Sequence, residues 1–256
     1  MTATPGTSVE HREQAHGTAP APAATGRVQR PVRSTASRGA AMDWTLPQRL
    51  YLLNFDLDKN KIDSSTALVR GQLMRGAAVA ELAIAGLLSD QDGKAVRSGA
   101  AAEPPSDPFL AEVLSSASPT EPRRWFTVVD RNWHRAEAAV RDQLEEQGAI
   151  TVHRGRALGV FPTRRPSLRD PGQVAGLRES TRNTAFLGRD PATVPVEDAV
   201  LAVLAADGDV CCTISRKERR EHKQALTALR DHVDAVLPRW RKAVGLSMTA
   251  RRTAAA

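Results

Sequence analysis

The segment VRGQLMRGAAVAELAIAGLL, residues 69–88, carries the clearest structural pattern in the chain. Its apolar and small residues recur at spacings of three and four, which is the period of one face of an α-helix. The residues on this face are Val69, Leu73, Gly76, Ala80, Ala83 and Leu87. Because several of them are small, a second helix can approach this face closely. The segment therefore predicts a long helix that packs tightly against another helix.

Helical patterns also dominate the sequence on both sides of this segment. Thr45 can cap a helix that has Pro47 in its first turn, and an apolar run follows at residues 48–54. Further helices are predicted at residues 108–116, 125–147, 173–188, 196–206 and 216–244, the last of them interrupted by Pro238. The predicted fold class is therefore mainly α.

The segments between these helices predict loops and one small β-hairpin. Residues 56–63 are a polar turn, and residues 89–108 contain a Pro-Pro pair and are expected to form a loop. Short strands are predicted at residues 149–153 and 157–161, joined by the turn Arg154-Gly155-Arg156.

The two ends of the chain lack such patterns. Residues 1–42 are rich in Ala, Pro, Thr, Gly and Ser, and they cannot bury enough apolar area to offset the entropy of ordering a chain. We therefore predict a disordered tail at residues 1–42, a helical domain at residues 43–246 and a disordered C-terminal tail at residues 247–256.

The net charge of +7 is distributed unevenly. Residues 1–42 carry +3, residues 43–213 carry −3, and residues 214–256 carry +7. This pattern favours an anionic partner, either a membrane or a nucleic acid, and charge by itself does not choose between them. The longest apolar stretch, residues 76–88, is interrupted by Glu81 and is shorter than the ~20 residues that a bilayer span needs. With no signal-peptide pattern either, the sequence predicts a soluble or peripheral protein.

Sequence motifs typical of enzymes and metal sites are either incomplete or absent in this sequence. Asp56-x-Asp58-x-Asn60 imitates the start of a calcium loop, but Lys61 and Ala67 stand where that loop needs Gly and Glu. The sequence has no glycine-rich phosphate loop, His-Glu-x-x-His or Gly-x-Ser-x-Gly motif. We therefore expect a protein that is not an enzyme and that needs no cofactor or metal.

The basic residues of 214–246 support an alternative function, a nucleic-acid-associated or protein-adaptor module. Several of them share one helical face, where they could neutralise phosphates. No helix-turn-helix, zinc-finger or aromatic stacking pattern accompanies them.

The order of several motifs resembles one protein family. The first motif is Leu46-Pro47-x-x-Leu50-Tyr51-Leu52-Leu53, and after the polar turn comes Arg75-Gly76-x-x-x-x-Glu81-Leu82-Ala83-x-x-Gly86. The helix end Leu144-x-x-x-Gly148-Ala149-Ile150, the hairpin through Phe161, and a late apolar helix before a basic one follow in the same order. Together they resemble the Golgi phosphoprotein 3 family over roughly residues 45–246. The abundance of Arg and Ala suggests a bacterial, and more narrowly an actinobacterial, member.

This resemblance implies a fold and a function. The fold is a helical bundle surrounded by amphipathic helices, with a projecting hairpin. The function is that of a peripheral membrane protein that binds anionic lipid headgroups, since eukaryotic members bind phosphatidylinositol 4-phosphate and also the cytosolic tails of glycosyltransferases. The implied partners are an anionic or phosphoinositide membrane lipid and a protein, whereas nucleic acid is not expected. The implied location is the cytoplasm, in peripheral association with the inner face of the membrane.

The resemblance also implies where the headgroup would bind. Arg75 matches a headgroup Arg of the family, whose Trp falls at Thr66 and whose two other Arg fall at His134 and Glu137. Neighbouring arginines can substitute for the last two, because an Arg fork suits phosphate oxygens. The expected headgroup site is Arg75, Arg131, His134 and Arg135. The basic hairpin suits an interfacial contact and a homo-oligomer contact equally.

Overall fold

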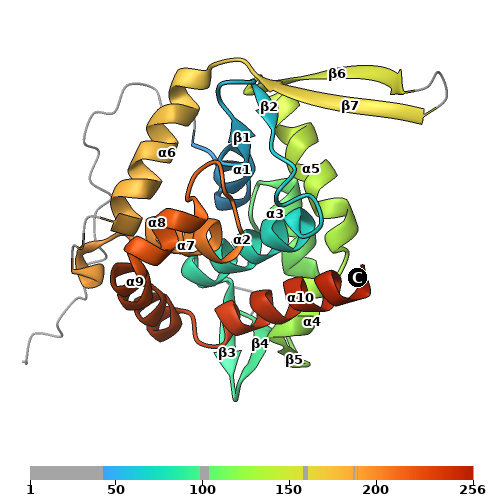
Figure 1. The fold of residues 1–256 in the computed structure, drawn as a ribbon. Coiled ribbons are helices and arrows are strands. Elements are labelled where there is room, and N and C mark those ends of the chain that lie inside the picture. Colours follow the sequence, from blue (N-terminus) through green and yellow to red (C-terminus); the bar gives the residue numbers. More distant parts are fainter. Residues whose placement is uncertain (1–42, 99–103, 158–160, 187, 189, 256) are drawn as a thin grey trace, which may run out of the picture. The chain divides into compact units, whose positions relative to one another are not determined.

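The computed structural model describes residues 43–98, 104–157, 161–186, 188 and 190–255, and these residues are mainly helical (Figure 1). The helices in chain order are α1 (Leu46–Leu52), α2 (Arg70–Ile84), α3 (Pro108–Ser115), α4 (Trp125–Asp130), α5 (Trp133–Glu146), α6 (Pro171–Phe186), α7 (Val196–Asp207), α8 (Arg216–Glu221), α9 (Lys223–Val236) and α10 (Trp240–Ala254), with a short 3-10 turn at Pro191–Thr193. The predicted mainly α class is confirmed.

Helix α2 lies at the centre of the packing. It contacts α1, α3, α4, α5, α7 and α10, and every residue from Arg70 to Ala80 is buried. Figure 1 shows α2 crossing the middle of the bundle with the other helices around it. A helix covered on most sides is rich in apolar and small residues, and the polar residues that it buries, such as Arg70 and Arg75, need internal partners.

Two glycines of α2 allow neighbouring helices to come close. A Cβ atom at Gly71 would lie 2.3 Å from the carbonyl oxygen of Trp133 in α5. One at Gly76 would lie 2.8 Å from a methyl group of Val244 in α10. The carbonyl of Gly76 also accepts a 2.8 Å hydrogen bond from the indole Nε1 of Trp240. The predicted close approach of a second helix is confirmed for α10 at Gly76. The approach of α5 at Gly71 lies outside the predicted face.

The structure contains more β-strands than the single hairpin that the sequence predicts. Strands β1 (Phe55–Asp56) and β2 (Lys61–Ile62) pair across the polar turn. Within the predicted loop at residues 89–108, β3 (Leu88–Gln91) and β4 (Lys94–Arg97) form an antiparallel hairpin, and β5 (Arg123–Arg124) pairs with β4. The loop prediction was wrong here because β3 has three exposed residues in a row and lacks alternation. The Asp92-Gly93 turn, with both residues at positive φ, was the hairpin signal that it overlooked.

The predicted hairpin exists and is longer than expected. Strand β6 (Ile150–Ala157) pairs antiparallel with β7 (Phe161–Leu168), and Figure 1 shows the pair extending away from the helices. The predicted turn Arg154-Gly155-Arg156 lies inside β6, where Gly155 pairs with Thr163. That part of the prediction was wrong, because the single glycine of Arg154-Gly155-Arg156 was taken to mark the turn, although Gly can also lie within a strand. Residues 158–160, which connect the strands, lie outside the described residues.

The predicted helix at residues 125–147 is divided into α4 and α5. Asn132 adopts a left-handed backbone conformation with φ 53°, which no α-helix continues through. Asn is one of the few residues that tolerate this conformation. The division exposes Arg131 and starts α5 at Trp133.

The predicted disorder at residues 247–256 was wrong for most of that segment, because α10 continues to Ala254. Ser247 and Met248 are buried, and the Ser247 hydroxyl donates a 2.6 Å hydrogen bond to Asp130, the last residue of α4. Trp240, Ala243, Val244, Ser247 and Met248 form one buried stripe at helical spacing. The predicted tail at residues 1–42 lies outside the described residues.

Candidate functional site

Three of the four predicted headgroup residues lie together on the surface. Arg131, His134 and Arg135 are exposed at the junction of α4 and α5. His134 and Arg135 belong to the first turn of α5, which contains no acidic residue. The positive end of the helix dipole adds to their charge. This junction therefore presents a positive potential to solvent.

Trp133 and Arg251 extend this surface. The guanidinium carbon of Arg251 in α10 lies 4.8 Å from the centre of the Trp133 ring, a cation–π arrangement. The His134 ring meets the same indole edge-on, with 5.9 Å between centroids. We call Arg131, His134, Arg135 and Arg251, grouped around Trp133, the α5 basic cluster. Arg251 was not predicted to belong to the site, because residues 247–256 were expected to be disordered.

Arg75, the fourth predicted residue, is completely buried and lies beneath this surface. Its Nη1 donates a 2.7 Å hydrogen bond to the Glu112 carboxylate, and its Nη2 donates to Ser116 Oγ and to the Val128 carbonyl. Burial lowers the pKa of Arg75, and the Glu112 charge opposes that shift. The structure thus gives Arg75 internal partners and separates it from the exposed cluster.

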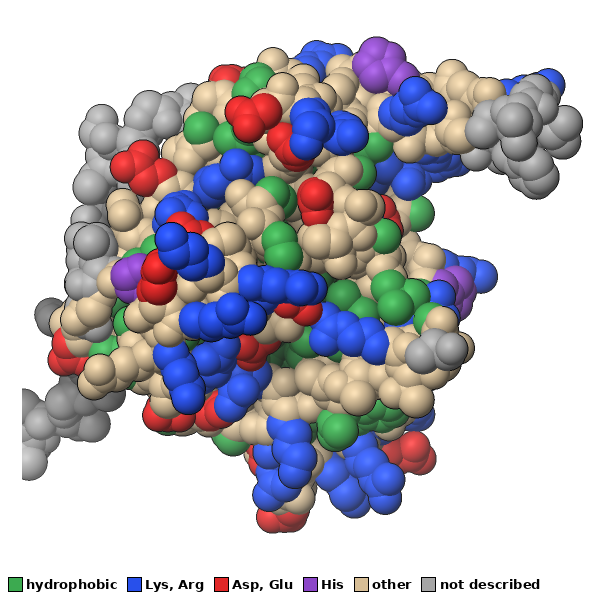
Figure 2. Space-filling model, viewed as in Figure 1, with side chains coloured by type: hydrophobic (Ala, Val, Ile, Leu, Met, Phe, Trp, Pro, Cys, Tyr) green, Lys and Arg blue, Asp and Glu red, His purple; other side chains and the backbone are tan. Residues whose placement is uncertain are grey.

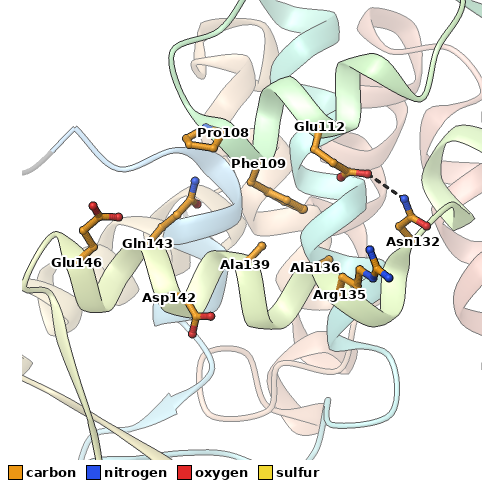
Figure 3. A pocket seen from close by; sticks show the side chains of 10 residues that line it. All are labelled: Pro108, Phe109, Glu112, Asn132, Arg135, Ala136, Ala139, Asp142, Gln143 and Glu146. Atoms are coloured by element: carbon orange, nitrogen blue, oxygen red, sulfur yellow. Dashed lines mark hydrogen bonds between the residues drawn. The ribbon is translucent and has the colours of Figure 1, made fainter.

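A groove of about 450 Å³ runs between α3 and α5, and one of its ends lies beside the cluster (Figure 3). Phe109 and the alanines of α5 form its apolar floor, and Arg135 and three carboxylates stand at its rim. The lining residues are Pro108, Phe109, Glu112, Asn132, Arg135, Ala136, Ala139, Asp142, Gln143 and Glu146. Because more acids than bases line the rim, an anion is not favoured along the whole length of the groove.

A comparison with protein-family models matches residues 46–246 to Golgi phosphoprotein 3 (GPP34). The chain belongs to the Golgi phosphoprotein 3 family. The match spans most of the chain and confirms the resemblance found in the order of motifs. Among curated proteins, none matches this chain significantly. The bacterial origin stays a prediction.

Two positions that the resemblance assigns to headgroup contacts, Thr66 and Glu137, instead bind a buried arginine in this Golgi phosphoprotein 3 family member. Arg70, which the sequence analysis did not single out, donates a 2.6 Å hydrogen bond to Glu137 and a 3.1 Å hydrogen bond to Thr66 Oγ1. Its Nη2 also donates to the carbonyl of Asp63. A small Thr therefore leaves room for a buried guanidinium, and Glu137 neutralises it.

The basic C-terminal region of this family member is partly paired within the protein. Four arginines of α8, α9 and α10 form ion pairs with two carboxylates at the C-terminal end of α7. Asp207 lies 2.7 Å from Arg230 and 3.7 Å from Arg241, and Asp209 lies 2.7 Å from Arg219 and 2.9 Å from Arg252. Figure 2 shows Lys and Arg side chains gathered over α8 and α10 with acidic side chains between them. This pairing reduces the charge that the region offers to a nucleic acid.

No helix among the described residues is long and apolar enough to cross a membrane. In the same part of the chain, His, Cys, Asp and Glu side chains do not gather in threes in a way that could hold a metal ion.

Proposed function

We propose that this Golgi phosphoprotein 3 family member is a peripheral membrane protein that binds anionic lipid headgroups, and that it acts by binding and not by catalysis. The observation that carries the proposal is the exposed α5 basic cluster. The proposed location is the cytoplasmic, inner face of a membrane.

The charges of the cluster support contact with a lipid surface. Arg131 and Arg135 are exposed, and the nearby Glu137 is neutralised by Arg70. Asp130 accepts a hydrogen bond from the neutral Ser247 hydroxyl and keeps its charge. Each basic residue near an anionic leaflet contributes about 1 kcal/mol of attraction, so three arginines provide useful but reversible binding. Their planar forks also suit the oxygens of lipid phosphates.

Vesicle co-sedimentation tests this proposal directly. The protein is mixed with neutral vesicles, phosphatidylserine vesicles and phosphatidylinositol 4-phosphate vesicles, the last two matched in surface charge. We expect binding to both anionic vesicles, weakening as salt rises, because salt screens exposed charges. Absence of binding to every anionic vesicle at physiological salt overturns the proposal.

A pair of double variants locates the contact. R131A/R135A removes two charges from the cluster and should reduce binding to anionic vesicles by about tenfold or more, at about 1 kcal/mol per residue. The matched control is K217A/R220A, which removes two exposed charges from α8. Equal losses in both would assign binding to overall charge and contradict the cluster. A gel shift with duplex DNA over a salt series checks the nucleic-acid alternative, and tight binding there without vesicle binding would replace the proposal.

A further inference from the structure

The groove between α3 and α5 is long and follows the axis of α5. Asp107, which precedes α3, accepts a 3.1 Å hydrogen bond from Gln143 near the end of α5. Glu112 in α3 accepts a 3.0 Å hydrogen bond from Asn132, which precedes α5. The two helices are therefore antiparallel, and the lining of the groove extends along α5 from Asn132 to Glu146, which is about 20 Å. This shape suits a slender, extended molecule.

The middle of the groove is apolar. Figure 3 shows Phe109 of α3 facing the side of α5 that carries Ala136 and Ala139. None of these three side chains has a polar atom, so a chain of methylene groups can lie on them without breaking a hydrogen bond. The volume of about 450 Å³ is within the range of sites for small molecules.

The rim of the groove is acidic at the end near Glu146. Glu146 is exposed, and none of the described basic residues forms an ion pair with it. Asp142 pairs with Arg141 at 2.8 Å and with Arg164 at 3.7 Å, but its side chain is 54% exposed, and such exposed pairs contribute little. The guanidinium of Arg135 lies at the opposite end of the groove. A cation is therefore favoured at the end near Glu146.

The last turn of α5 makes this end more negative. It carries Glu145 and Glu146 and no basic residue, although the negative end of a helix dipole favours cations. Asp107 lies at the same end. Burial raises the pKa of Glu81 to about 7, and the charges of Asp107 and Asp43 raise it further. A cation bound here would offset both the helix dipole and the crowding of these carboxylates.

We propose that the groove between α3 and α5 binds a short aliphatic polyamine. Its methylene chain lies on Phe109, Ala136 and Ala139, and two of its ammonium groups lie at Asp142 and Glu146. Residues four apart on a helix have Cβ atoms about 5–6 Å apart, which is similar to the separation of two ammonium groups joined by a short methylene chain. Each ammonium group has several N–H donors for carboxylate oxygens. This binding needs no membrane, so it is independent of the proposed function.

Calorimetric titration with spermidine tests the site. We expect one spermidine to bind with a Kd on the order of 0.1 mM at physiological salt. Hexaamminecobalt(III), a compact cation of the same charge, should bind at least about tenfold more weakly, because it has no chain to cover the apolar floor. Equal affinity for the two cations would indicate a general counter-ion effect and would overturn the proposal.

Two variants alter the groove itself. E146Q removes the carboxylate that lacks an ion pair and should weaken spermidine binding by about fivefold or more. It should also fold, since it removes an acid from the negative end of a helix. A139L places a larger side chain on the floor of the groove and should weaken spermidine binding to a similar degree. Spermidine binding unchanged in either folded variant overturns the proposal.

The matched control is E145Q, which removes the same charge from the same turn of α5. Glu145 pairs with Arg154 and does not line the groove. E145Q should therefore bind spermidine as the wild type does. Equal losses in E145Q and E146Q would assign binding to overall charge and overturn the proposal.

Tetralysine tests whether the groove holds a basic peptide in place of a polyamine. Its charges stand on separate side chains and not along one slender chain, so it should bind more weakly than spermidine and should not respond to A139L. Tetralysine that binds more tightly than spermidine, and loses affinity in both E146Q and A139L, would assign the groove to a basic protein segment and overturn the proposal.

Discussion

Arg251 covers one face of the Trp133 indole, with its guanidinium carbon 4.8 Å from the ring centre, and so joins the end of α10 to the start of α5. Both side chains are half-buried. The contact adds a charge from a distant part of the chain to the α5 basic cluster.

Replacing Arg251 with Ala should therefore weaken two properties at once. We expect a loss of about 0.5–1 kcal/mol in unfolding free energy from the cation–π contact. We also expect weaker binding to anionic vesicles, because one charge leaves the cluster. R251K keeps the charge and should restore most of the vesicle binding. Chemical denaturation and co-sedimentation measure the two effects, and vesicle binding unchanged in R251A would remove Arg251 from the contact surface.

Gly76 should not tolerate even one added methyl group. A Cβ there would lie 2.8 Å and 3.2 Å from the two methyl groups of Val244, so G76A should destabilise the protein by about 1–3 kcal/mol through overpacking. The control is G245A in α10, where a Cβ meets nothing within 4 Å. That change should stabilise the helix by about 0.5–1 kcal/mol. Denaturation midpoints of the two variants should move in opposite directions, and the V244A change should partly rescue G76A.

Glu81 should make stability depend on pH near neutrality. Burial raises the pKa of Glu81 to about 7, although the Leu46 amide donates a 2.7 Å hydrogen bond to its carboxylate. The folded state therefore holds this proton more tightly than the unfolded state, where Glu titrates near 4.5. Stability from this group is present at low pH and is lost as pH rises through the folded pKa.

The variant E81Q removes that loss. It should exceed the wild type in unfolding free energy by about 1–3 kcal/mol at pH 8, and the difference should shrink toward pH 5. Urea denaturation at the two pH values provides the measurement. A constant difference across this range would mean that Glu81 does not titrate there.

Asp207, at the end of α7, should contribute more to stability than an exposed acid of α9. It pairs with Arg230 of α9 and Arg241 of α10, and its side chain is 21% exposed. D207N should lower the unfolding free energy by about 1 kcal/mol, an effect that salt reduces. D231N, which changes an exposed acid of α9, provides the control. Equal effects of the two changes would show that the arginine pairs at Asp207 add nothing measurable.

Local patterns predicted some elements well and failed at others for identifiable reasons. The helix α2 was clear because its apolar and small residues recur at spacings of three and four over the whole segment. The β3–β4 hairpin was missed because its exposed strand has no alternation, although Asp92-Gly93 marks its turn. The division between α4 and α5 depends on one left-handed residue, Asn132, and hydrophobic periodicity continues across it.

The sequence by itself determined the mainly helical class, the central helix and the family, because these follow from periodicity, small residues and the order of motifs within short segments. Only the tertiary structure decided which basic residues face solvent. Arg75 is paired by Glu112, 37 residues away, and Trp133 is covered by Arg251 from the last helix. The burial and pairing of a charge depend on side chains that folding brings together from distant segments, so an Arg in a motif shows its chemistry but not its exposure.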